Sequence, residues 1–238
     1  MASGDGEGEG SVSGDIDDLE SLISTTDVER LKRAWRQEKA APEIFQFEAA
    51  LIQRIKEQIQ LMEETVEDFA ESGIDPLTVS LYQMDLDRTQ FLLRSYLRIR
   101  LQKIEKYMFH ILNTDELFNR LSREEKSFAE RCSNDLKMHL DENILSKLPD
   151  NYQSLLKQSI ISEETDMVPK PQLDTFVVCK TKYYLGHIQL EDINNGNTDD
   201  RVNQRPLEEP FEMEPNVLYF VRYKPIKKLV EGGKIDLY

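Results

Sequence analysis

The chain has 238 residues, enough for a sizeable hydrophobic core and for one or two domains. Its formal net charge of −15 argues against a protein that grips nucleic acid by neutralising phosphates. Its apolar runs are too short for a transmembrane helix, and Cys132 and Cys179 are too few for a disulfide framework or a zinc site.

The negative charge is concentrated in two segments. Residues 1–20 hold seven acidic residues and no basic one, and residues 191–214 hold eight acidic and two basic residues, which leaves −2 for the rest of the chain. Segments of this polar composition cannot bury enough apolar surface to offset the entropy of ordering. We therefore expect a disordered acidic tail over residues 1–26 and a mobile acidic loop over residues 191–210.

Residues 15–23 of this tail, DIDDLESLI, differ from their surroundings. Leu19, Leu22 and Ile23 have helical spacing, and the acidic residues before them, Asp17 and Asp18 among them, suit a helix N-terminus. Two interpretations stay open: an accidental hydrophobic patch, or a peptide that folds onto a groove of a partner protein.

The next part of the chain predicts a bundle of helices. Thr26 or Asp27 can cap a helix that ends near Ala40 and buries Val28, Leu31 and Trp35, and Pro42 suits the first turn of a second helix over 43–71. The periodic apolar pattern predicts a third helix over 77–112. A capping box at Ser122 and Glu125 starts a fourth helix over 122–146, and a short fifth helix follows over 150–158.

The second and third helices carry apolar residues in two different patterns. The second has a single seam typical of a two-helix contact, formed by Ile52, Ile55, Ile59, Met62, Val66 and Phe69. The third has one stripe of Leu93, Leu97, Leu101, Ile104, Met108 and Ile111, and another of Leu92, Tyr96 and Ile99. A helix that is apolar over so wide an arc is packed on several sides. In a bundle this small, the pattern indicates an obligate assembly with another chain.

The pattern changes after residue 160. Pro169 and Pro171 mark a linker over residues 161–173. Runs of β-branched and aromatic residues predict strands over 175–179 and 217–221, and a short helix over 225–230 and a strand over 234–238 follow. The predicted fold is α+β: an all-α helical bundle over 27–160, then a small β-rich domain over 174–238. A domain this small should dock against another structural element.

No arrangement of residues indicates catalysis. The chain has no phosphate-binding loop, no nucleophile elbow and no metal-spaced cluster, and His110, His139 and His187 are isolated. Asp85 and Asp87 cannot chelate one ion from a helix, because positions two apart face different directions. The sequence therefore predicts a non-enzymatic protein with no catalytic residue, cofactor or metal site.

Basic residues between 87 and 106, including Arg98 and Arg100, fall at several angles around their helix. A helix face that binds along DNA needs its basic residues aligned on one side. We expect these Lys and Arg side chains to form ion pairs with acidic residues of neighbouring helices or subunits. Any direct contact with DNA is then minor.

Several segments resemble the SLD-five type of GINS complex subunit. They are residues 31–44 (LKRAWRQEKAAPEI), 95–106 (SYLRIRLQKIEK), 168–174 (VPKPQLD), 222–226 (RYKPI) and 234–237 (KIDL). The resemblance spans residues 27–238 in order and without large gaps.

The resemblance implies a helical A-domain and a small β-rich B-domain in one of four paralogous subunits. These subunits form the heterotetrameric GINS complex. That complex joins the MCM ring and the forty-five-type cell-division-cycle protein in the nuclear CMG replicative helicase and helps to link it to polymerases. The implied function is that of a non-enzymatic scaffold required for initiation and elongation of DNA replication. The alternative from the residues alone is a generic helical adaptor that acts outside replication.

The resemblance also extends to the tail. Residues 15–23 are similar to the acidic and leucine-containing peptide with which the yeast subunit docks on a trimeric And-one-type replisome hub. Asp17, Asp18, Leu19, Leu22 and Ile23 are the implied docking residues, although the spacing of their apolar side chains differs from the family pattern. Candidates for the subunit interface or the core are Trp35, Tyr96, Leu97, Arg98, Arg100, Ile104, Tyr223 and Leu237.

Overall fold

The structure is a computed structural model that describes residues 26–158, 167–188 and 211–238. The helical part consists of α2 (Asp27–Ala40), α3 (Ala49–Glu71), α4 (Pro76–Leu112), α5 (Asp115–Asn119) and α6 (Arg123–Asn143), with 3-10 turns at Leu145–Lys147 and Asp150–Tyr152.

The C-terminal part is a small sheet with one helix. It consists of β1 (Phe176–Thr181), β2 (His187–Ile188), β3 (Phe211–Glu212), β4 (Leu218–Arg222), α7 (Tyr223–Glu231) and β5 (Ile235–Leu237). In the antiparallel sheet β4-β1-β5, Val178 lies opposite Phe220, and Lys180 lies opposite Asp236. β2 and β3 form a separate two-stranded pair. The predicted α+β class is confirmed.

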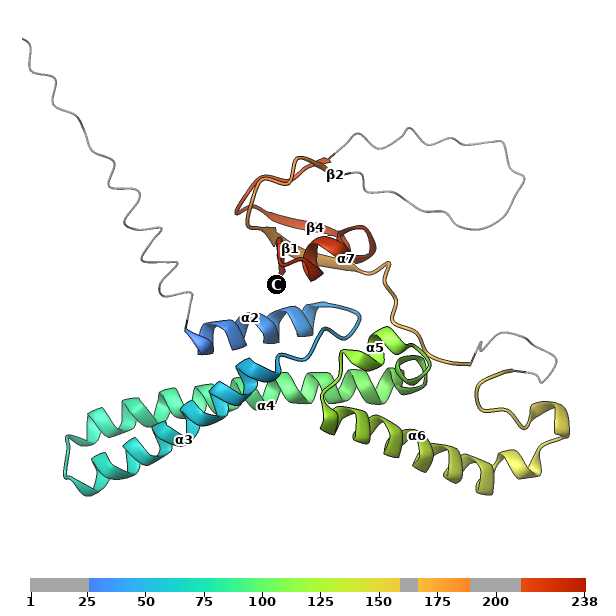
Figure 1. Cartoon of the computed structure of the whole chain (residues 1–238), viewed down its shortest axis with the longest axis horizontal. Coiled ribbons are helices and arrows are strands. Elements are labelled where there is room, and N and C mark those ends of the chain that lie inside the picture. Colours follow the sequence, from blue (N-terminus) through green and yellow to red (C-terminus); the bar gives the residue numbers. More distant parts are fainter. Residues whose placement is uncertain (1–25, 159–166, 189–210) are drawn as a thin grey trace, which may run out of the picture.

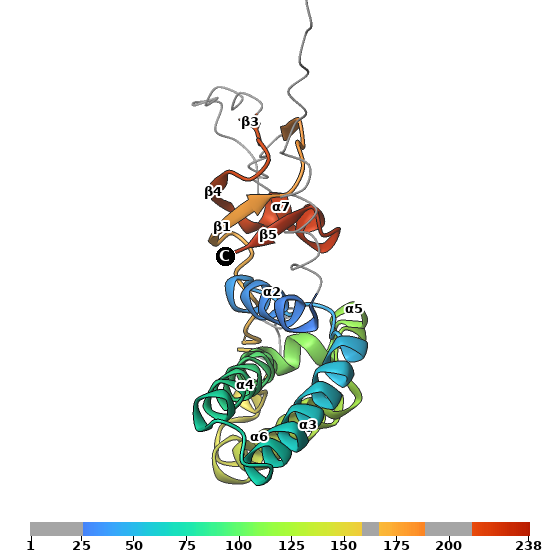
Figure 2. The same ribbon diagram turned by 90° about the vertical axis from the view of Figure 1, so that its left-hand side faces the viewer.

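Helix α2 separates the two parts in space. The sheet and α7 lie on one side of it, and α3, α4 and α6 lie on the other (Figures 1 and 2). α3 and α4 form a long antiparallel hairpin that extends away from the sheet (Figure 1). Any shift of α2 would therefore change the position of the C-terminal part relative to the bundle.

The helix starts follow their capping residues. Thr26 caps α2, with its side chain accepting from the Glu29 amide at 3.3 Å. Ser122 and Glu125 form the predicted capping box of α6, because each side chain binds the backbone amide of the other residue. Each cap pairs amides that the first helical turn leaves without a partner.

Two helix predictions are wrong. α3 begins at Ala49 instead of residue 43, and only a 3-10 turn, Asp150–Tyr152, forms in the predicted fifth helix. In that second region, Gln153 donates to the Leu148 carbonyl, and the Ser154 hydroxyl accepts from the Lys157 amide. Such local side-chain bonds compete with the helical ladder.

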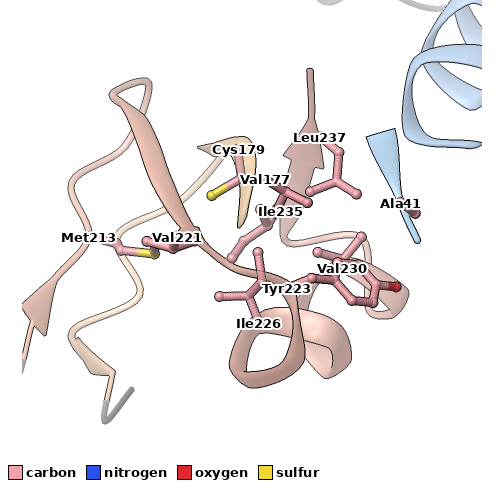
Figure 3. Close-up of a cluster of buried hydrophobic side chains, with 10 residues drawn as sticks. All are labelled: Ala41, Val177, Cys179, Met213, Val221, Tyr223, Ile226, Val230, Ile235 and Leu237. Carbon is pink, nitrogen blue, oxygen red and sulfur yellow. The ribbon is translucent and has the colours of Figure 1, made fainter. Parts of the chain in front are cut away.

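Buried apolar side chains form three clusters. One lies between α2, α3 and α4, one lies around Ile104 and α6, and one fills the space between the sheet and α7. Figure 3 shows the third cluster, in which Ala41, from the segment after α2, lies near Tyr223, Val230 and Leu237. The core of the small domain is therefore completed by the helical part, which explains how a sheet this small is stabilised.

Candidate interaction surfaces

A buried guanidinium, that of Arg100, joins three helical segments. It makes a two-point contact with Glu125, with Nε to Oε1 at 2.7 Å and Nη2 to Oε2 at 3.0 Å. It also donates to Glu38 at 3.0 Å and to the carbonyls of Phe45 and Arg120. These five bonds use all five guanidinium donors. Burial alone disfavours the charge, but the bonds to Glu125 and the charge of Glu38 raise the pKa of Arg100 above its usual value.

The segment between α2 and α3 is held by cations that bind its carbonyls. Lys103 donates to the Glu43 carbonyl at 2.8 Å, Arg120 to that of Ile44 at 3.1 Å, and Arg100 to that of Phe45 at 2.8 Å. These long-range bonds hold the segment in a non-helical path, so that α3 starts at Ala49 and not at residue 43. Burial lowers the pKa of Lys103, although its bond to Glu38 at 2.8 Å opposes the shift.

The carboxylate of Glu43 links this segment to the small domain. It accepts from the Tyr223 hydroxyl at 3.0 Å and from Lys227 Nζ at 2.8 Å, and all but 3% of Glu43 is buried. Burial and the negative charge of Glu43 raise the pKa of Tyr223, so its hydroxyl keeps its proton and donates it. Glu43 is therefore a fixed link between the two parts.

Further charged pairs surround this link. Arg33 on α2 contacts Asp236 on β5 at 2.6 Å, and Arg120 contacts Glu231 at the end of α7 at 2.7 Å. The guanidinium of Arg36 lies 4.9 Å from the centre of the Tyr238 ring. Together with Glu43, these contacts fix the orientation of the sheet on the bundle.

An apolar stripe on α4 is left exposed. It consists of Leu77, Leu81, Met84 and Phe91, and we call it the α4 stripe. At about 100° per residue, these positions fall within an arc of about 80°, away from the buried face of the helix. Phe91 is 63% exposed. Exposed Arg88 lies within the same arc between Met84 and Phe91. Exposed apolar side chains that share one face of a helix are candidates for an interaction site.

A second exposed apolar surface lies on the sheet and consists of Phe176, Val178, Leu218 and Phe220, which we call the sheet patch. The rings of Phe176 and Phe220 stack with their centres 5.0 Å apart. The burial of alternate residues along β1 places these side chains on the face opposite α7 and the core. The sequence showed these residues as strand formers but did not indicate which face is exposed.

The candidate interface or core residues lie in several environments. Tyr96, Arg100, Ile104, Tyr223 and Leu237 are buried, Trp35 and Leu97 are half-buried, and Arg98 is exposed. Trp35 donates to the Ser95 hydroxyl at 2.9 Å, which joins α2 to α4. Burial raises the pKa of Tyr96 to about 12. The ion pairing expected for the basic residues of α4 is seen at Arg100 and Lys103, which both pair with Glu38 of α2.

The docking residues predicted in the tail, Asp17 to Ile23, lie outside the described residues, as does the loop at 191–210. Within the described ranges, no three His, Cys, Asp or Glu side chains are grouped so that they could hold a metal ion. None of the helices in these ranges is both long and apolar enough to span a membrane.

Two family models match the chain. The model for the "GINS complex protein helical bundle domain" matches residues 50–143, and the model for the "DNA replication complex GINS protein SLD5 C-terminus" matches residues 171–237. The first includes most of α3 and all of α4, and the second includes the whole sheet.

Curated relatives match along nearly the full chain. The DNA replication complex GINS protein SLD5 of Arabidopsis thaliana is 60% identical over 220 residues, which cover 92% of this chain and 94% of that protein. The protein of the same name from Homo sapiens is 31% identical over 215 residues, 88% of each chain. That from Dictyostelium discoideum is 27% identical over 215 residues, which cover 88% of this chain and 90% of that protein.

Proposed function

The chain belongs to the SLD5 family of GINS complex subunits, and from this we propose that it is a scaffold subunit of a GINS heterotetramer in the nuclear CMG replicative helicase. As a member of this family, it is a non-catalytic component of a DNA replication complex whose partners are the other GINS subunits. Membership excludes the alternative of an adaptor that acts outside replication.

The observation that carries the proposal is the α4 stripe. Leu77, Leu81, Met84 and Phe91 are exposed on a helix that the bundle covers only on its other side. Interfaces between permanent partners resemble a domain core cut in half, with apolar side chains on both surfaces. A sister subunit that packs on the stripe would remove these side chains from water and gain the corresponding free energy.

The fixed link between the two parts of the chain supports a scaffold role. Because Glu43, Arg33 and Arg120 hold the sheet on the bundle, the α4 stripe and the sheet patch keep a constant relative position. A subunit of this kind can hold partners at fixed positions within the helicase and toward the polymerases. The MCM ring and the forty-five-type cell-division-cycle protein are the partners that we assign to the assembled complex.

We assign the tail a separate role in docking on the And-one-type hub. The supporting feature is the sequence DIDDLESLI, in which Leu19 and Leu22 follow Asp17 and Asp18 at helical spacing. In a titration of a tail peptide against the hub, changing both leucines to alanine should weaken binding at least tenfold. Unchanged binding would reject this role without affecting the scaffold proposal.

The scaffold proposal is tested by a charge placed on the α4 stripe. Co-expression of Leu81→Glu with the three sister subunits should yield less four-subunit complex than wild type, because the carboxylate would be buried at an apolar interface. The matched control is Gln83→Glu, which adds the same charge at an exposed position about 160° around the helix from Leu81 and outside the α4 stripe. Equal yields from the two variants would show that the stripe is not an interface.

A further inference from the structure

A cleft of about 670 Å³ lies where α2, the start of α3 and the end of α7 meet. Its lining includes the apolar side chains of Leu51 and Val230. Four guanidinium groups, of Arg30, Arg33, Arg54 and Arg120, also line it, together with two carboxylates, of Glu48 and Glu231, so that the lining has more cations than anions. This volume is within the range of ligand pockets, and junctions between structural units are where such pockets are common. The cleft combines apolar surface with arginine donors, which suits an acidic peptide that carries aliphatic residues.

Of the two arginines nearest the start of α2, Arg30 is the one whose charge is incompletely paired. Arg54 binds both oxygens of Asp27, at 2.8 and 2.9 Å. Arg30 approaches the same carboxylate only to 3.8 Å, and its side chain makes no hydrogen bond to any described residue. Glu48 and Glu57 also act on Arg54 through their charges, whereas Arg30, with half its side chain exposed, retains donors for an added anion.

The chain itself supplies a matching segment next to this cleft. Residues 15–23 lie outside the described residues and precede Thr26, the cap of α2. They contain four acidic residues, no basic one, and the apolar Leu19, Leu22 and Ile23. Ile23 is three residues from Thr26, a span of at most about 10 Å, so the segment needs no long linker to reach Arg30.

We propose that residues 15–23 bind in the cleft of their own chain, with the acidic side chains against Arg30 and Arg54 and the leucines against Leu51 and Val230. Short tethers give effective concentrations of about 1 mM, so even a contact with a millimolar dissociation constant is substantially occupied. The proposal does not depend on hub docking. A partner that takes the tail would first have to displace it from the cleft.

The test is hydrogen exchange of the amides of residues 15–23 in the full-length chain, assembled with its sister subunits and without any hub protein. A free peptide of the same sequence is the reference. At millimolar effective concentration, protection of about 2- to 10-fold over the peptide is expected. Arg30→Glu combined with Arg54→Glu should abolish this protection. If that variant does not assemble, Arg30→Gln with Arg54→Gln gives the same comparison with a smaller change.

The matched control is Lys32→Glu, because Lys32 is an exposed cation on the same helix that does not line the cleft. This change should leave the protection intact. Adding Asp17→Arg and Asp18→Arg to the two arginine-to-glutamate changes should restore it. Exchange at the peptide rate in wild type would overturn the proposal. Protection that survives the arginine changes would also overturn it, because the tail would then be bound by a sister subunit. Protection that disappears on dilution would overturn it too, because the tail would then be bound by a second copy of the chain.

Discussion

Replacing Arg100 with methionine should destabilise the helical bundle strongly. The change removes five hydrogen bonds and leaves the buried carboxylates of Glu38 and Glu125 without their main cation. Breaking a buried ion pair by removing one partner costs about 3–5 kcal/mol. The complex that contains this subunit should therefore melt at a clearly lower temperature. Lys103 and the Ser122 amide still bind these carboxylates, which places the expected cost toward the lower end.

The assay is thermal unfolding of the assembled complex, followed by far-UV circular dichroism. Arg94→Met is the matched control, because Arg94 is exposed on the same helix and its side chain donates to Gln90 of that helix, so it should change the melting temperature much less. Adding Glu125→Gln to Arg100→Met should recover part of the loss, since glutamine removes the stranded charge and can keep the capping box. Equal melting temperatures for the Arg100 and Arg94 variants would refute this explanation of bundle stability.

Three further changes test other parts of the structure. Tyr223→Phe should lower the free energy of unfolding by about 1–3 kcal/mol in denaturant titrations, because Glu43 loses a buried hydrogen-bond donor. An unchanged free energy would mean that this bond does not hold the two parts of the chain together. Burial raises the pKa of Asp236 above its usual value of 3.8. The free energy of unfolding of wild type relative to Asp236→Asn should therefore increase as the pH is lowered from 7 toward 4. A difference that stays constant or decreases would contradict the pKa shift. Cys179 is buried and its thiol pKa is raised to about 11. In native protein, an alkylating reagent should therefore modify Cys132 much faster than Cys179, as followed by mass spectrometry. Equal labelling of the two cysteines would contradict this.

Local signals predicted most helices. The Ser122 and Glu125 capping box placed the start of α6 correctly. The seam that begins with Ile52 and Ile55 predicted a two-helix contact, and the structure shows α4 packed on it. These features depend on residues three to seven positions apart, so they can be interpreted without knowledge of the fold.

The start of α3 could not be predicted in this way. Pro42 and the residues after it are compatible with a helix, but the carbonyls of Glu43, Ile44 and Phe45 bind cations that come from residues 100–120. Those long-range bonds override the local preference, because they also satisfy buried charges.

The roles of the basic residues were only partly visible in the sequence. The sequence predicted the same pairing with acidic residues for Arg98 and Arg100. Arg100, which lies four residues from both Tyr96 and Ile104, is buried, whereas Arg98 is exposed. No comparable signal marked Glu43, since its partners Tyr223 and Lys227 lie about 180 residues away. The exposed side of the sheet also depended on the packing of α7.

The most direct test of the scaffold role is the native mass of the protein after co-expression with the three other GINS subunits. We expect one predominant species that contains one copy of each subunit, and poor solubility of the chain when it is expressed alone, because the α4 stripe and the sheet patch are then exposed to water. A stable, soluble monomer that does not associate with the other three subunits would contradict this role.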